Sequence, residues 1–278
     1  MMRVLRVDMF GAAPGRGSTL DVLIPAGRCD DGVVAEAAEY ARQGNSDESA
    51  LVSECSPAQQ TFGSRIFNTD GETPFGTHSL AGVAACLVGT GQLAPGDVGR
   101  KAEVGCQWLW TDGRDVRVPF DGPVVHEPIP HDPALFGWRR GTSHAGGVGR
   151  AFNLVRVTED PRSLPVPDLD RMRELGLTDL TAYRWDPDRQ EVLARVFAPG
   201  FGIPEDAGCL PAAAALGLTG LGLTADGRSP VTVRQVTGDG RESVFGCTGA
   251  SHGDTASVRI TGQVWVPAID DEQKVSEG

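Results

Sequence analysis

The segment RIFNTDGETPFGTHSLAGVAACLVG, residues 65–89, indicates how the whole chain is organised. It begins as an apolar strand, continues through a Gly-rich turn, and predicts a small-residue helix that starts near His78 or Ser79. A second copy, RVFAPGFGIPEDAGCLPAAAALGLTGL at 195–221, has the same order, with its helix expected to begin at 209–211. A unit repeated half a chain length apart predicts two similar domains that face each other. Proton-carrying side chains cluster at the two helix starts, so we expect the active site between the halves.

Composition excludes several classes of partner. The chain has 278 residues, 40% of them hydrophobic and 22% charged, as in ordinary soluble globular proteins. Its formal net charge of -12 argues against nucleic acid or a membrane surface as the main partner. A local helix N-terminus could still bind a small anion. Since no apolar run approaches about 20 residues and no secretory segment opens the chain, we expect a cytoplasmic protein.

The cysteines predict neither disulfides nor a metal site. The six cysteines form no CxxC pair, and no histidine cluster has the spacing of metal ligands. We therefore expect no bound metal.

Short alternating segments predict an α+β protein with mostly antiparallel, strongly curved sheets. Strands are expected at 4–9, 19–24, 48–54, 61–67, 101–105, 107–111, 115–120, 152–157, 179–185, 191–197, 231–236, 242–247, 257–260 and 263–266. Further helices are expected at 33–42 and 168–175, the first with acidic residues at its N-terminus. The proline-rich stretch 119–133 predicts an interdomain crossing. We expect domains at 1–122, joined by a last strand near 262–268, and at 134–261, followed by a disordered tail at 269–278.

Three positions are candidates for chemistry. Glu48 opens a predicted strand, His78 opens the first central helix, and Glu205-Asp206 precedes the second. Each also has a simpler interpretation, since a strand-initial glutamate is usually solvated, a histidine can cap a helix, and an acid suits a helix N-terminus. Glu72 and Glu205 are expected to hold turns and backbone N–H groups.

These motifs resemble the PhzF-like family, phenazine-biosynthesis isomerases that share the diaminopimelate epimerase fold. The family's Arg-Ile-Phe…Glu-Leu-Pro-Phe-Ala-Gly-His-Pro-Thr segment is similar to residues 65–80, where Glu72 and His78 match along with Pro74 and Phe75. Its Arg-Val-Phe-Ala-Pro…Glu-Asp-Pro-Ala-Thr-Gly-Ser-Ala segment resembles 195–212, and its Ser-Glu-Thr-Thr-Phe segment resembles 47–51. The resemblance implies two similar domains, each a curved, mostly antiparallel sheet or barrel around a central helix. It also implies a homodimer.

The resemblance further implies a proton shuttle that needs no cofactor. A carboxylate removes a C–H proton beside an acidifying group and returns it elsewhere, so that a double bond moves. Glu48 matches the family's general acid/base, and an efficient base near neutrality requires burial. His78 and Asp206 match residues that position the substrate and stabilise charge. The corresponding substrate-binding residues are Gly76, Thr77, Ser79, Gly208 and Cys209.

The implied substrate is a small conjugated acid or cyclic amino-acid-like compound of secondary metabolism, of the kind used in antibiotic biosynthesis. An unsaturated, proline-like precursor is one candidate. Two departures from the family bear on how it would bind. The family's Ala-Thr-Gly-Ser, whose Gly-Ser pair binds a substrate carboxylate, is replaced by residues 208–211. Because Pro211 has no N–H to donate, carboxylate binding there is weakened or replaced. The Gly before the family's His is Thr77.

Two alternatives remain open. Cys209 lies four residues after Glu205, where epimerase relatives carry a catalytic cysteine. A thiol at a helix N-terminus is expected to have a lowered pKa and could pair with Glu48 or His78 in an epimerase or racemase. The partner cysteine of a two-thiol site is not found near Thr77, which favours an inert Cys209. The second alternative is a non-catalytic binding protein with the same fold.

Overall fold

The computed structural model describes residues 2–73, 76–102, 105–128, 132–138 and 141–267, apart from the side chains of Thr77, His78 and Pro128. The tail predicted at 269–278 lies outside the described residues. The chain divides into two compact units. Unit 1 consists of Met1–Val118 with Gly262–Gly278, and unit 2 of Pro119–Thr261.

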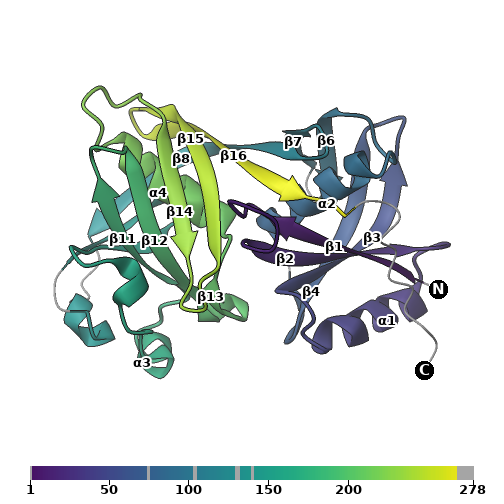
Figure 1. Cartoon of the computed structure of the whole chain (residues 1–278), viewed down its shortest axis with the longest axis horizontal. Coiled ribbons are helices and arrows are strands. Elements are labelled where there is room, and N and C mark those ends of the chain that lie inside the picture. Colours follow the sequence, from purple (N-terminus) through teal and green to yellow (C-terminus); the bar gives the residue numbers. More distant parts are fainter. Residues whose placement is uncertain (1, 74–75, 103–104, 129–131, 139–140, 268–278) are drawn as a thin grey trace. The chain divides into compact units, whose positions relative to one another are not determined.

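Unit 1 is built on a mostly antiparallel sheet whose path of paired strands is closed. Most of its strands are labelled in Figure 1. Its elements are β1 (Met2–Met9), β2 (Ser18–Pro25), α1 (Asp31–Arg42), β3 (Glu48–Ser56), β4 (Thr61–Asn68), β5 (Gly71–Thr73), α2 (Thr77–Gly89), β6 (Gly96–Lys101), β7 (Cys106–Thr111), the start of β8 (Asp115–Pro128) and the end of β16 (Thr255–Trp265). The strand order is β7-β6-β4-β3-β2-β1-β16, β5 pairs with β4, and β8 pairs with both β7 and β16. Only the β2–β3 and β4–β6 pairings are parallel among those described in this unit.

Unit 2 repeats the plan. Its remaining elements are η1 (Pro133–Phe136), β9 (Thr142–Val148), β10 (Phe152–Arg156), η2 (Pro161–Ser163), α3 (Leu169–Glu174), β11 (Leu180–Asp186), β12 (Glu191–Ala198), η3 (Pro199–Phe201), β13 (Ile203–Asp206), α4 (Leu210–Leu221), β14 (Val231–Val236) and β15 (Glu242–His252). The strand order β11-β10-β9-β8 continues through β16-β15-β14-β12, and β11 also pairs with β12. The path through unit 2 is therefore closed as well.

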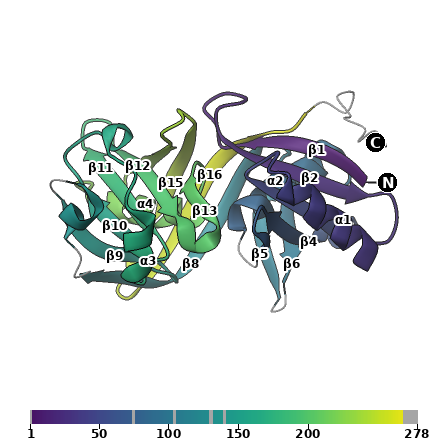
Figure 2. The same cartoon turned by 90° about the horizontal axis from the view of Figure 1, so that it is seen from below.

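Each unit surrounds one apolar helix. Almost all of α4 is buried, and α4 packs against β9, β12, β14 and β15 (Figures 1 and 2). The helix α2 is buried from Leu80 to Val88 and packs against β1, β2, β3, β6 and β7. A helix that is apolar on all sides must be enclosed, so the sheets curve around these two. The predicted fold, an α+β protein with two curved sheets around central helices, is confirmed.

The other helices pack on different apolar clusters. α1 contributes Ala37 and Ala41 to a cluster with Leu51 and Phe67, and α3 contributes Met172 to a separate cluster in unit 2. Asp30 caps α1 by accepting a hydrogen bond from the N–H of Val33, as the acidic start predicted. No helix in the described part of the chain has the length and apolarity of a membrane span.

The sequence repeat is also a repeat of contacts. In unit 1, Arg65 binds Glu72 through two hydrogen bonds, Nε to Oε1 at 2.7 Å and Nη2 to Oε2 at 2.6 Å. In unit 2, Arg195 binds Glu205 in the same bidentate way, and its Nη1 donates to the carbonyl of Leu164 at 2.6 Å. Glu205 also accepts the N–H of Gly238. Both glutamates therefore hold the strand and the turn before a central helix, as expected.

Several predicted boundaries were wrong for identifiable reasons. The proposed crossing at 119–133 is a strand, β8, as far as Pro128. The prolines do not end this strand, because backbone groups beside them still form hydrogen bonds with other segments. The N–H of Val124 donates to the carbonyl of Asp254, and the carbonyl of Pro123 accepts the N–H of Gly149. The predicted strand at 101–105 lies earlier, at β6, and the two predicted strands after 257 are one strand, β16. The strand β9 was missed because its Ala-Gly-Gly sequence is not typical of a strand. β5 and β13 were missed because they are too short to show alternation.

We predict that the two equivalent ion pairs differ greatly in their contribution to stability. The Arg195 side chain is 5% exposed and that of Arg65 is 39% exposed. Arg195→Met leaves Glu205 without its cation and is expected to cost about 3 kcal/mol or more. Arg65→Met is expected to cost about 1 kcal/mol or less because its pair is open to water. Chemical denaturation of both variants measures the difference, and equal losses would contradict the prediction.

Candidate active site

Glu48 is buried inside unit 1, where it is the first residue of β3. It is 3% exposed and opens β3, where it is in register with Leu20 of the parallel strand β2. The preceding Asp47 accepts the N–H of Thr19 at 2.8 Å, and the hydroxyl of Ser46 donates to the carbonyl of Glu48 at 2.7 Å. These contacts hold the backbone at the start of β3, from which the Glu48 side chain extends. The interpretation of Glu48 as a solvated surface residue is therefore wrong.

The N-terminus of α2 contacts this carboxylate directly. Ser79, in the first turn of α2, is 0% exposed, and its hydroxyl donates a hydrogen bond to Oε2 of Glu48. Gly76 precedes the helix, and a Cβ there would lie 2.7 Å from Cδ1 of Ile66 on β4, so glycine permits this close approach. Thr77 and His78 form the start of the helix, but their side chains lie outside the described part of the structure. Of the predicted residues in unit 1, the structure thus brings Glu48 and Ser79 together.

Arg100 is a residue near Glu48 that the sequence analysis missed. It follows Val98 by two positions on β6, so both side chains point to the same face of the sheet, where Val98 is fully buried. Nη2 of Arg100 makes one long hydrogen bond, 3.4 Å, to the carbonyl of Ser64. Burial lowers the pKa of Arg100, and the negative charge of Glu48 opposes that effect. An arginine at an inward position of a strand is the signal that could have identified it.

In unit 2, Asp206 and Gly208 come together before α4. Asp206 ends β13, is 5% exposed, and accepts the N–H of Gly208 at 2.8 Å. Cys209 is the N-cap residue of α4. The side-chain amide of Gln235, on β14, forms hydrogen bonds with both the N–H and the carbonyl of Cys209. The N–H of Cys209 donates to Oε1 of Gln235 at 2.7 Å, and Nε2 of Gln235 donates to the carbonyl of Cys209 at 2.9 Å. Gln235, 0% exposed, is a second residue that the sequence analysis missed.

The expected pKa of the Cys209 thiol was wrong in direction. Burial raises the pKa of Cys209 well above its ordinary value, and the nearby Asp206 charge raises it further. Asp179, another buried carboxylate, acts in the same direction. These effects exceed the opposing contribution of the helix N-terminus, where the N–H of Ala212 meets the thiol. Cys209 is therefore a neutral thiol rather than a thiolate at neutral pH.

The backbone donors at the start of α4 are almost all engaged within the protein. The N–H groups of residues 208 and 209 are bonded to Asp206 and Gln235. Those of residues 212 and 213 meet the thiol and the carbonyl of Cys209, and Pro211 has no N–H. At most the N–H of Leu210 remains for a ligand. The expectation that carboxylate binding at this helix start is weakened agrees with these contacts.

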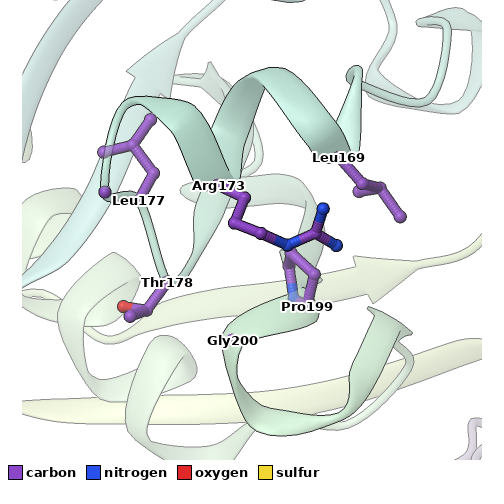
Figure 3. A pocket seen from close by; sticks show the side chains of 7 residues that line it. Leu169, Arg173, Leu177, Thr178, Pro199 and Gly200 are labelled. Atoms are coloured by element: carbon purple, nitrogen blue, oxygen red, sulfur yellow. The ribbon is translucent and has the colours of Figure 1, made fainter.

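A pocket in unit 2 lies apart from the predicted site residues. A shallow pocket lies between α3 and η3 and is lined by Leu169, Arg173, Leu177, Thr178 and Pro199, with Arg173 extending toward Pro199 (Figure 3). It contains none of the predicted site residues. Within the described ranges, no group of three or more histidine, cysteine, aspartate or glutamate side chains is arranged to hold a metal ion.

Comparison with known proteins gives the fold. No protein-family model matches the chain, and no curated protein matches its sequence. Among solved structures, a phenazine biosynthesis protein of the PhzF family from Enterococcus faecalis has a TM-score of 0.75 at 18% identity, over 96% of both chains. A predicted epimerase from Pseudomonas aeruginosa has a TM-score of 0.72 at 22% identity over 100% of both chains. A hydroxyproline epimerase from Agrobacterium vitis, solved with trans-4-hydroxy-L-proline, has a TM-score of 0.62 at 15% identity, over 96% of this chain and 91% of that one.

These similarities extend over almost the entire chain and include both units. They agree with the repeated strand–turn–helix motif and with the closed sheet around each central helix. The chain therefore has the PhzF-like fold, a member of the diaminopimelate epimerase-like fold class.

Proposed function

We propose that this protein is a cofactor-independent isomerase that moves a proton, and with it a double bond, on a small conjugated acid or cyclic amino-acid-like compound. The observation that carries the proposal is the Glu48 carboxylate, buried and hydrogen-bonded to Ser79 in the first turn of α2. An anion held in such a place is suited to remove a weakly acidic C–H proton. The fold shared with PhzF-family and epimerase structures supports the same reaction class.

In this proposal Glu48 takes the proton from one carbon of the substrate and returns it to another. The C–H electron pair enters the conjugated system, so the double bond shifts and no oxidant or reductant is needed. The positive end of the α2 dipole stabilises the negative charge that develops on the substrate. His78 and Asp206 orient the substrate. We further propose a cytoplasmic homodimer acting in secondary metabolism, with an unsaturated proline-like precursor as the first substrate to test.

Glu48→Gln is predicted to abolish isomerisation. The amide keeps the shape and can still accept from Ser79, but it cannot take up a proton, so the rate should fall by about 10²–10⁴-fold. The measurement is NMR in deuterated water over a panel of small unsaturated amino acids and cyclic acids, following deuterium uptake and the shifted double bond. The matched control is Glu54→Gln, which alters an exposed glutamate on the same strand, paired with Lys101. Exchange that survives Glu48→Gln would contradict the assignment.

An epimerase that uses Cys209 is the second candidate, since Cys209 caps α4 as a catalytic thiol would. The raised pKa of its thiol speaks against it, because the thiolate is the reactive form. We predict that iodoacetamide at pH 8 modifies the exposed Cys106 well before Cys209. Mass spectrometry of the labelled peptides gives the order of modification.

Cys209→Ala is expected to retain proton exchange in the same NMR assay. Rapid alkylation of Cys209 together with loss of exchange in Cys209→Ala, but not in Glu48→Gln, would favour the epimerase instead. Tight ligand binding without any turnover, unchanged by Glu48→Gln, would favour a non-catalytic binding protein.

A further inference from the structure

We propose that Arg100 binds the carboxylate of the substrate, so that this chain recognises its anionic group in unit 1 rather than at the start of α4. The inference rests on the proposed function, because it takes the substrate to be a small acid. The substrate class that follows is a small carboxylic acid.

Arg100 has unused hydrogen-bonding capacity in a partly buried place. Its Nε is buried and has no hydrogen-bond partner, and Nη2 makes only the long bond to Ser64. No carboxylate of the described residues forms an ion pair with it, whereas Arg195 and Arg65 each bind a glutamate bidentately. A guanidinium offers five donors in a planar fork that matches a carboxylate. A partly buried guanidinium whose N–H donors are not all used is suited to bind an anionic ligand.

The start of α4, in unit 2, offers few backbone donors to a carboxylate. Residues 208, 209, 212 and 213 use their N–H groups internally, and Pro211 lacks one. A carboxylate needs at least two donors to be held firmly, and the start of α4 has at most one to give. An acidic substrate therefore requires a different group for its anion.

A cation that binds the substrate carboxylate also offsets negative charge at the reacting carbon. Glu48 is anionic when it acts as a base, and a substrate carboxylate close to it would be repelled. The guanidinium of Arg100 compensates the charge of a carboxylate bound to it, which weakens the repulsion by Glu48. The same cation stabilises the additional negative charge that appears when the proton leaves.

The test measures binding separately from turnover. Cyclopent-1-ene-1-carboxylate and its neutral carboxamide serve as probes in ligand-observed NMR titrations of wild type, Arg100→Met and Arg100→Lys. Wild type should prefer the acid, and Arg100→Met should lose that preference, with acid binding weakened about 10- to 100-fold. Arg100→Lys should retain part of it, since it keeps the charge without the planar fork. Wild type that binds the amide as well as the acid, or an unchanged preference in Arg100→Met, would overturn the proposal.

Two controls complete the design. Lys101→Met removes a cation from the next position on β6, where the side chain is exposed and paired with Glu54, and should leave the preference for the acid intact. Without ligand, Arg100→Met should raise the melting temperature by a few degrees, because it removes a partly buried charge that forms no ion pair with a described residue. A lowered melting temperature would indicate a structural role and count against the proposal. Glu48→Gln should keep the preference while losing exchange, so failure of the isomerase proposal and failure of this one are distinguishable.

Discussion

The enclosure of two helices that have no polar face is the constraint on which the rest of this structure depends. Along α4, side chains are buried on every side, and α2 is buried from Leu80 to Val88. Such helices cannot lie on a flat sheet, because one flank would remain in water. Each sheet therefore curves until its strand path closes. The N–H groups of the first turn, which a helix cannot satisfy by itself, are among the polar groups left inside each unit. Buried polar side chains also lie at both helix starts, Glu48 and Ser79 at α2 and Asp206 before α4.

The sequence predicts this plan because the features that produce it are local. A repeated Arg-apolar-Phe strand, a glycine turn and an Ala/Leu helix can be recognised without knowledge of tertiary contacts, and the burial of Glu48 agrees with the role that its motif implies. What could not be predicted depends on side-chain direction and on partners far away in the chain. Arg100 looks like a surface arginine until the sheet turns it inward with Val98. Gln235 acquires its role only because β14 passes beside the cap of α4. The thiol of Cys209 was misjudged because the field of a helix end is local, whereas desolvation depends on the whole packed unit.

The two helix starts have therefore become chemically different although they arise from one repeated motif. At α4, an aspartate, a glutamine and a cysteine satisfy the backbone donors, which makes that end of the helix rigid and nearly saturated. At α2, the contact of note is a serine hydroxyl that donates to a carboxylate, and no acidic residue belongs to the first turn of the helix. The positive end of the α2 dipole thus lies at the Glu48 carboxylate. A protein built from two similar halves in this way can use one half to hold reactive charge and the other to position neutral groups.

Glu48 and Arg100 are opposite charges within unit 1 that do not form an ion pair with each other. Opposite charges in a partly buried region gain most by direct contact, yet Arg100 forms no ion pair with any described residue. Separate partners hold the two groups instead, Ser79 for the carboxylate and the carbonyl of Ser64 for the guanidinium. Direct pairing would neutralise the base and occupy the cation, so neither could act on a ligand. Under the role proposed for Arg100, a bound anion supplies the ion pair that no described residue gives this guanidinium.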